Sequence, residues 1–320
     1  MDRYPPYKIL ITLVLIALPV TGYLLLVPGT QHKTGWLNQT GVSPALINAV
    51  PAMAGGTRKG PDLPVAADTE SVKKNSVDFT PPRQPIEFFG DTAVLEPFFQ
   101  QLYHYSQGLG QIRILHYGDS QLEEDRITRY LRARLQAQFP AQEDQTQIQV
   151  ENIPKRGSAG IDLVPDHGPP PSLIIMQFGI NVVRARTRDF SYYTRALIKQ
   201  IHRFMAVNPH VSILLVGVSD MAHREANAIY SYATVPLIRD AQVEAARKIP
   251  VAFWDLYKMM GGNGSAARWY LADPPLIRED MTHFSFAGGE EIANQLFDAL
   301  MWAYHRWIIK FNSNSNEPDT

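Results

Sequence analysis

The sequence predicts an α/β domain in which helices cover both faces of a parallel sheet. Between residues 95 and 309, short strand-like apolar runs alternate with longer segments whose apolar residues recur at helical spacing. Two of these runs, 173–176 and 211–216, are almost continuously apolar, as strands buried on both faces of a sheet are. Ligands of such sheets gather beyond the carboxyl ends of the strands, so a site is expected in the loops that follow them.

The first thirty residues predict a membrane anchor. Residues 9–27 form an apolar run of 19 residues, which at about 1.5 Å per residue matches the hydrocarbon thickness of a bilayer. Arg3 and Lys8 precede this run, so the positive-inside tendency leaves the amino terminus in the cytoplasm. A cleaved signal peptide is the competing interpretation, but the nearest Ala-x-Ala, at 52–54, lies far beyond the run. We therefore expect residues 1–28 to be an uncleaved transmembrane helix in a bacterial inner membrane, with the domain in the periplasm.

The remaining bulk features describe a tethered domain. Residues 29–88 are rich in Pro, Gly, Ala, Thr and Asn and predict a flexible linker, while the polar tail 312–320 is predicted to be disordered. The domain itself is expected over residues 89–311. A formal net charge of -1 and the lack of a basic run exclude an electrostatic case for nucleic acid. The lack of cysteine excludes disulfides, thiolate metal sites and a cysteine nucleophile.

Each predicted strand of the domain is short and ends in a polar turn. The predicted strands span residues 112–117, 148–153, 173–178, 211–218 and 251–254. The predicted helices span residues 95–105, 122–139, 192–207, 235–248 and 286–309. This order of strand and helix indicates a parallel sheet with crossover helices.

The first predicted strand ends at a small polar turn that contains Ser120. The turn reads Gly118-Asp119-Ser120, and the predicted helix 122–139 follows it. At such a helix start the backbone NH groups are unpaired and the helix dipole favours negative charge, which suits a hydroxyl that becomes a nucleophile. An ordinary serine N-cap fits this stretch equally well.

Three further loops contain the groups that a serine nucleophile requires. His283 lies in Asp280-Met281-Thr282-His283, where an acid three residues before the histidine can reach its ring and select the tautomer. Gly160 follows the second strand, where a glycine lets a backbone NH approach a ligand closely. Asn181 follows the third strand and offers a side-chain amide to an oxyanion. Taken singly, each of these residues is also explained by turn chemistry.

In order and approximate spacing, these four blocks resemble those of the SGNH (GDSL-type) hydrolases. The resemblance covers about residues 95–309 and implies a three-layer α/β/α sandwich of flavodoxin-like type. It implies that Ser120 is the nucleophile, His283 the general base and Asp280 its orienting partner. It also implies an oxyanion hole made by the Ser120 NH, the Gly160 NH and the Asn181 side chain.

Two positions depart from this family pattern or leave it open. Gly157 is the alternative to Gly160 as oxyanion donor, because the loop contains both glycines. Val182 occupies a place where the third block commonly has an aspartate, so a loop-stabilising acid is lost there. Asn181 itself is intact.

Several residues outside the four blocks are candidates for shaping the site. Ser219, Asp220 and His223 follow the fourth strand and either bind substrate or close a loop, and Trp269 either stacks on a sugar or packs inside. Asp255 is an alternative acid that we rank below Asp280. Arg184, Arg186 and Arg188 add positive charge near Asn181, although solvated arginines are the default interpretation. No metal site or cofactor is predicted, since His-Glu-x-x-His is absent.

These features lead to three functional hypotheses. The first is a serine esterase that removes O-acetyl groups from a cell-envelope or secreted polysaccharide. The second uses the same residues to transfer an O-acetyl group to a polysaccharide hydroxyl beside a membrane O-acyltransferase partner, because water and a sugar hydroxyl attack the same acyl-serine. The third is an inactive glycan-binding SGNH module. A lipase is less favoured because no exposed apolar lid segment is evident.

Overall fold

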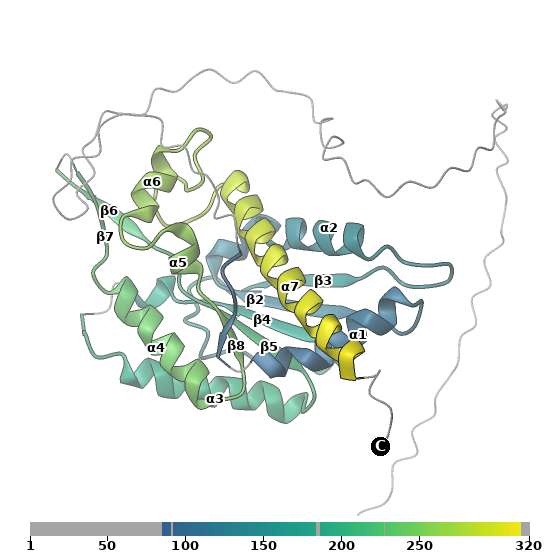
Figure 1. Cartoon of the computed structure of the whole chain (residues 1–320). Helices are drawn as coiled ribbons and strands as arrows, with labels where there is room; N and C mark the ends of the chain where they lie inside the picture. The colour runs from purple at the N-terminus through teal and green to yellow at the C-terminus, as the bar shows by residue number, and fades with distance from the viewer. Residues whose placement is uncertain (1–84, 91, 184–185, 227, 315–320) are drawn as a thin grey trace, which may run out of the picture. The chain divides into compact units, whose positions relative to one another are not determined.

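The central sheet orders its strands as β1-β8-β5-β4-β2-β3 in the computed structural model, which describes residues 85–90, 92–183, 186–226 and 228–314 (Figure 1). The strands are β1 (Phe89–Gly90), β2 (Arg113–Gly118), β3 (Gln149–Pro154), β4 (Leu173–Gln177), β5 (Ser212–Val216) and β8 (Ala252–Trp254). Every neighbouring pair from β8 to β3 is parallel, and β1 pairs with β8 in the antiparallel sense. The parallel part has the flavodoxin-like strand order.

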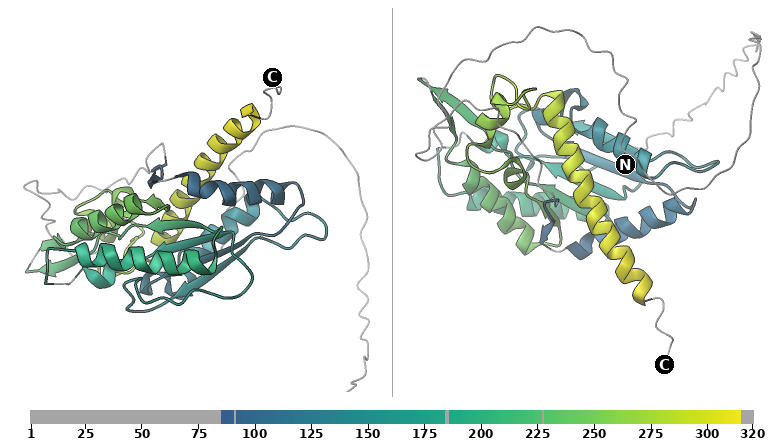
Figure 2. Two further views of the ribbon diagram at one scale, coloured as in Figure 1. Left: turned by 90° about the horizontal axis from the view of Figure 1, so that it is seen from below. Right: turned by 45° about the horizontal axis from the view of Figure 1, so that its top comes forward.

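Helices cover both faces of this sheet, as the sequence predicts (Figures 1 and 2). One face packs under α1 (Glu96–Ser106), α2 (Thr128–Gln138) and α7 (Phe286–Asn314), and the other packs under α3 (Ser191–Val207) and α4 (Val235–Lys248). Successive side chains of a strand point to opposite faces, so Ile114 of β2 joins the first core and Leu115 the second. The predicted α/β/α layering is therefore confirmed.

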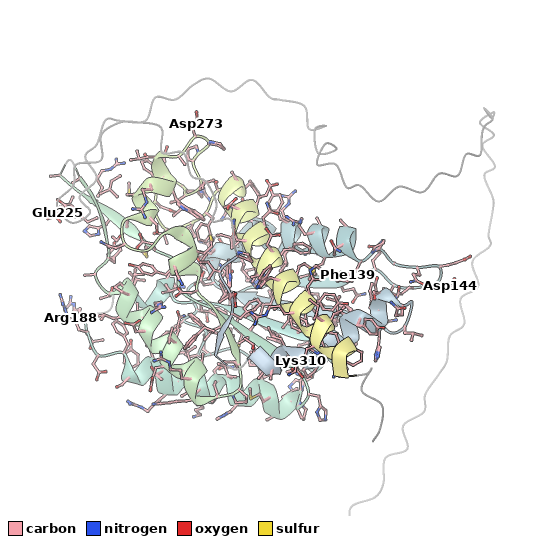
Figure 3. The ribbon with its side chains drawn as sticks, in the orientation of Figure 1. Phe139, Asp144, Arg188, Glu225, Asp273 and Lys310 are labelled. Atoms are coloured by element: carbon pink, nitrogen blue, oxygen red, sulfur yellow. The ribbon has the colours of Figure 1, made fainter. Side chains whose placement is uncertain are left out.

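Additional elements at one end of the molecule were not predicted. A hairpin of β6 (Ala222–Glu225) and β7 (Ala228–Ser231) follows β5, and the short helices α5 (Leu256–Met260) and α6 (Ser265–Leu271) follow β8. Figure 3 shows Glu225, Arg188 and Asp273 at this end of the molecule and Asp144 at the opposite end. The hairpin strands are too short to show an apolar alternation in the sequence.

The helix predicted over 122–139 begins later than expected. Residues Ser120–Asp125 form a 3-10 turn (η2) that Glu123 interrupts with extended backbone and Glu124 with a left-handed φ of 59°, and α2 starts only at Thr128. Asp119 caps the turn by accepting a hydrogen bond from the Gln121 NH. The expectation that an α-helix dipole acts directly on Ser120 is therefore wrong.

The described residues cover only part of the terminal segments that the sequence predicts. The predicted anchor, 1–28, and nearly all of the predicted linker, 29–88, lie outside the described residues. Among the described residues no helix is both long and apolar enough to cross a bilayer. At the other end α7 continues to Asn314, so the prediction of disorder from residue 312 is wrong for 312–314.

Candidate active site

Ser120 lies at the point where the chain direction reverses across the sheet. Strand β2 has β3 on one side and β4 on the other. The chain therefore runs toward one edge of the sheet from β2 to β3 and toward the other edge from β4 onward, and such a reversal opens a crevice at the carboxyl end of β2. The turn after β2 is tight because Gly118 has no side chain: a Cβ there would lie 2.5 Å from Leu122 Cδ1. The serine is consequently held against the sheet edge and is 7% exposed.

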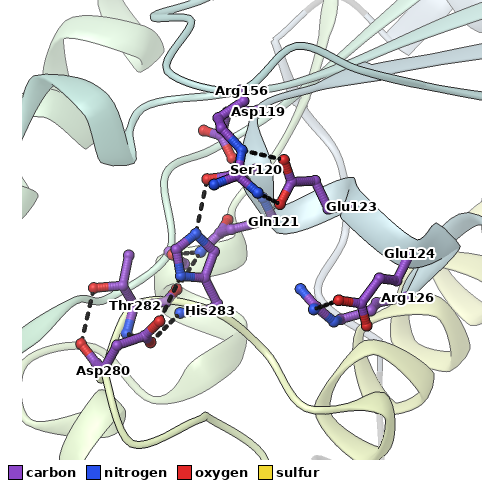
Figure 4. A network of polar contacts seen from close by, with 11 residues as sticks. Asp119, Ser120, Gln121, Glu123, Glu124, Arg126, Arg156, Asp280, Thr282 and His283 are labelled. Atoms are coloured by element: carbon purple, nitrogen blue, oxygen red, sulfur yellow. Dashed lines mark hydrogen bonds and ion pairs between the residues drawn. The ribbon is translucent and has the colours of Figure 1, made fainter.

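The structure brings Ser120, His283 and Asp280 into one chain of hydrogen bonds (Figure 4). Ser120 Oγ lies 2.7 Å from His283 Nε2, and His283 Nδ1 lies 2.7 Å from Asp280 Oδ2. A histidine placed in this way can accept the serine proton on one nitrogen while the carboxylate holds a proton on the other. The geometry therefore fits an activated serine nucleophile.

The electrostatics of Asp280 select the histidine tautomer that this chemistry needs. Asp280 Oδ1 accepts hydrogen bonds from the backbone NH groups of Thr282 at 3.0 Å and His283 at 2.9 Å. Burial alone would raise the pKa of Asp280, but the hydrogen bonds from the His283 ring, the His283 NH and the Thr282 NH hold it well below its usual value. An ionised Asp280 keeps the proton on His283 Nδ1, which leaves Nε2 free to accept from Ser120.

A small closed loop positions His283 at the start of α7. Its two sides meet at an antiparallel bridge between Ile277 and Phe284, and the Arg278 NH donates to the His283 carbonyl at 2.8 Å. Helix α7 packs closely on this loop, because a Cβ at Gly288 would lie 1.9 Å from the Leu276 carbonyl oxygen. The close packing of α7 against Leu276 thus holds the loop that carries His283 in place.

Two of the predicted oxyanion residues, Asn181 and Gly160, lie in adjoining loops. The Asn181 side chain donates to the Ser158 carbonyl at 2.9 Å, and its amide has a second hydrogen. Gly160 has a φ of +77°, and a Cβ there would lie 2.6 Å from the Phe178 ring, so this position requires glycine. The Gly160 NH, however, donates to Ser158 Oγ at 3.0 Å within its own loop. Its role as an oxyanion donor remains a prediction that requires this bond to be shared or broken.

Val182, which departs from the family pattern, is explained by packing. Its side chain is buried in a core cluster with Ile180, Val183 and Val218. Its NH donates to the Gly179 carbonyl at 3.0 Å, which closes the turn from the backbone. The loop that carries Asn181 is therefore held without an acidic side chain.

Two buried ionisable groups lie next to the nucleophile turn. Burial raises the pKa of Asp119 to about 7, although the Gln121 NH donates to its carboxylate at 3.0 Å. Burial lowers the pKa of His116 in β2 to about 4, and its Nδ1 lies 2.9 Å from Thr128 Oγ1. Such shifts arise from desolvation, which a sequence pattern does not reveal.

Three of the four candidates for substrate binding, Ser219, Asp220 and Trp269, are buried, so that part of the prediction is wrong. Ser219 accepts a hydrogen bond from Gln121 at 2.8 Å, and Trp269 is 1% exposed and packs on the Phe284 ring. The buried Asp220 carboxylate accepts hydrogen bonds from Ser231 Oγ at 2.7 Å and the Ala266 NH at 2.9 Å. These contacts close loops and join β7 to α6, which agrees with the structural alternatives for these residues.

The other charged candidates lie away from the histidine or on the surface. Asp255 forms an ion pair with Arg239 at 2.5 Å and caps α5, so it does not orient His283. Arg186 and Arg188 are exposed, and Arg184 lies outside the described residues.

Two surface features lie near the site, and of their residues the sequence analysis named only His223 as a candidate for the site. Arg156, from the loop after β3, forms a two-bond ion pair with Glu123 of η2 at 2.6 and 2.7 Å. On the β6–β7 hairpin, His223 and Tyr230 are partly exposed, and their ring centres lie 6.2 Å apart. The Ala222 NH of β6 donates to the Met281 carbonyl at 3.1 Å, so the hairpin contacts the loop that carries His283.

Three of the solved structures that match the chain are esterases of acetylated carbohydrates. A peptidoglycan O-acetylesterase has a TM-score of 0.60 at 15% identity, covering 68% of this chain and 99% of its own. A two-domain esterase active on acetylated mannans has a TM-score of 0.48 at 13% identity, covering 66% and 55%. An acetyl xylan esterase has a TM-score of 0.44 at 15% identity, covering 59% and 99%. At 15% identity the likeness to the peptidoglycan O-acetylesterase shows a shared fold.

Sequence comparison identifies the family directly. No curated protein sequence matches the chain significantly. The model of the GDSL-like lipase/acylhydrolase family matches residues 114–290, which is more than half of the chain and includes Ser120, Asn181, Asp280 and His283. The chain belongs to the GDSL-like lipase/acylhydrolase family and is a carboxylic ester hydrolase.

Proposed function

We propose that this protein is a serine esterase that removes O-acetyl groups from a cell-envelope or secreted polysaccharide. The observation that carries the proposal is the hydrogen-bonded chain from Ser120 through His283 to Asp280 at the switch point of an acylhydrolase fold. The fold shared with a peptidoglycan O-acetylesterase supports an acetylated carbohydrate as the substrate class.

In this proposal the ester is cleaved in two steps through an acyl-serine. Ser120 Oγ attacks the ester carbonyl while its proton passes to His283 Nε2, and Asp280 stays ionised and stabilises the imidazolium. Collapse of the tetrahedral intermediate breaks the bond to the sugar oxygen, which takes the proton from His283 and leaves. His283 then removes a proton from water, whose oxygen attacks the acetyl carbonyl; collapse of this second intermediate breaks the bond to Ser120 Oγ, which takes the proton back from His283 as acetate leaves.

The oxyanion of each tetrahedral intermediate would be stabilised by the Ser120 NH and the second amide hydrogen of Asn181. The Gly160 NH joins them once its hydrogen bond to Ser158 Oγ is shared with the oxyanion. Preorganised donors of this kind are worth about 3–4 kcal/mol each in acyl transfer.

The polysaccharide would extend along the β6–β7 hairpin. Partly exposed rings of His223 and Tyr230 on this hairpin can stack on sugar faces, a role that the buried Trp269 does not serve. We expect Tyr230→Ala to raise KM for an acetylated polymer and to leave kcat/KM for p-nitrophenyl acetate within about twofold. An equal loss on both substrates would contradict this placement of the polymer.

We also propose that the domain works in the periplasm of a bacterium, anchored by residues 1–28 in the inner membrane and separated from it by the linker 29–88. The apolar run at 9–27 and the preceding Arg3 and Lys8 support this location. Without protease, the protein should be found in the membrane fraction of the cell. Protease added to intact spheroplasts should digest the domain, because the domain faces outward.

The central test is the substitution Ser120→Ala. It should reduce acetate release from an acetylated glycan, and p-nitrophenol release from p-nitrophenyl acetate, by more than about 1000-fold. Circular dichroism and Tm should stay those of the wild type, because the change removes one oxygen. Undiminished turnover in Ser120→Ala would rule out the proposed mechanism.

The assay of the wild-type protein with an acceptor glycan added separates hydrolysis from transfer. If the protein is instead an O-acetyltransferase that works beside a membrane O-acyltransferase, acetate from a donor ester will appear on an acceptor glycan rather than in water. An inactive glycan-binding module would bind the polymer without releasing acetate from any ester. The intact contact between Ser120 and His283 favours an active enzyme over such a module.

A further inference from the structure

A buried glutamine directly after the nucleophile links its turn to the loop that carries His283. The Gln121 side chain is 2% exposed, and its Nε2 donates to Ser219 Oγ and to the Thr282 carbonyl, both at 2.8 Å (Figure 4). A side-chain amide nitrogen has two hydrogens, so both are used. The residue therefore connects η2 with two loops that are distant in sequence.

The Thr282 carbonyl belongs to the peptide unit whose other end is the His283 NH. That NH donates to Asp280 Oδ1 at 2.9 Å. One peptide unit is thus held on its carbonyl side by Gln121 and on its NH side by Asp280. Because a peptide unit is planar, fixing both ends sets its orientation and the direction in which the His283 side chain leaves the backbone.

The loop before His283 has a conformation that depends on such external contacts. Met281 has a φ of +54°, which places a residue with a side chain in the left-handed region. The Asp280 side chain, which accepts the Thr282 and His283 NH groups, is about half exposed. Gln121 supplies a contact from the sheet side, where water does not compete.

We infer that Gln121 is a positioning residue for the reaction: it holds the Thr282–His283 peptide so that His283 Nε2 stays within hydrogen-bond reach of Ser120 Oγ. The inference rests on the proposed function, since it concerns the same serine and histidine. The hydrogen bonds of the Gln121 amide nitrogen go to Ser219 Oγ and the Thr282 carbonyl, so it acts on His283 through the backbone. Small displacements of a catalytic base are costly, because proton transfer depends on sub-ångström alignment.

The test replaces the Gln121 amide by an apolar side chain of similar volume. Gln121→Leu leaves the Thr282 carbonyl and Ser219 Oγ without their donor, and kcat for p-nitrophenyl acetate should fall about 10- to 100-fold while KM changes less than about twofold. Inactivation of Ser120 by phenylmethylsulfonyl fluoride should slow in parallel, because it uses the same base. Gln121→Met repeats the experiment if the leucine variant does not fold.

A second buried glutamine provides the matched control. Gln200 of α3 also donates from its side-chain amide to a loop carbonyl, that of Leu163 at 3.0 Å, but it contacts none of the catalytic residues. Gln121→Leu and Gln200→Leu should lower Tm by similar amounts, and only the former should lower kcat. Wild-type kcat in Gln121→Leu, or an equal loss of kcat in Gln200→Leu, overturns the inference. Failure of the proposed function looks different, because the wild-type protein would then neither cleave esters nor react with the fluoride.

Discussion

Replacing Asp280 by asparagine tests how the carboxylate directs the proton on His283. The two oxygens of Asp280 have separate tasks: Oδ2 faces His283 Nδ1, and Oδ1 accepts two backbone NH groups. Asparagine has one oxygen. If that oxygen stays with the backbone, its NH₂ group faces Nδ1 and drives the ring proton to Nε2, where it blocks acceptance from Ser120. If the amide flips, its NH₂ group opposes two NH donors instead.

The size of the expected loss of kcat depends on how far the Asp280 carboxylate is exposed to water. A buried triad acid costs about 10⁴-fold in kcat when it becomes an amide. The Asp280 side chain is 48% exposed, so water can partly replace it, and we expect a loss of about 100- to 1000-fold, or about 3–4 kcal/mol of barrier. The measurement is kcat for p-nitrophenyl acetate at pH 7.

The neighbouring residue supplies a charge-matched control for this prediction. Glu279→Gln removes the same charge one residue earlier and should retain kcat within about twofold, as surface substitutions usually do. Thermal unfolding should show that Asp280→Asn is folded at the assay temperature. An Asp280→Asn enzyme that keeps more than a tenth of the wild-type kcat would refute the tautomer argument.

Three stability predictions concern residues near the active site. The pKa of Asp119 is raised from 3.8 to about 7, so between these values the native state keeps a proton that the unfolded chain loses, and stability falls as pH rises; Asp119→Asn should remove this fall. The pKa of His116 is lowered from 6.5 to about 4, so stability falls as pH drops through that window; His116→Asn should remove this opposite fall. Urea unfolding at pH 4.5 and 7 measures both slopes, and unchanged slopes contradict the burial argument. Gly288→Ala should destabilise the protein by about 1–3 kcal/mol, because its Cβ overlaps the Leu276 carbonyl, and an unchanged Tm would show that α7 can shift freely.

The sheet and its helices could be predicted because burial restricts the composition of each element. Strand β4 is buried along its whole length and reads as an apolar run, and α4 begins and ends where its periodicity predicts, at residues 235 and 248. The meeting of Ser120 with His283 was implied by the resemblance of the four blocks to a hydrolase family, since His283 follows α6 and not a strand end.

The start of α2 could not be predicted, because side chains from elsewhere hold the preceding turn open. Leu122 and Ile127 have helical spacing with the residues after them, yet η2 is interrupted at Glu123 and Glu124. Glu123 pairs with Arg156 of another loop, and the Asp125 carboxylate pairs with Arg132 of α2 at 2.9 Å. Local periodicity contains no information about these partners.

The sequence by itself determined which chemical groups are available: a serine after a strand, an acid and a histidine before the last helix, and glycine and asparagine at two other strand ends. Only the tertiary structure decided which hydrogen-bond partners these groups have. Gln121 and Thr282 are separated by 161 positions, yet they share a hydrogen bond, and the Gly160 NH is taken up by Ser158. Hydrogen-bond partners and burial depend on which distant segments pack together, and that packing is a property of the folded chain.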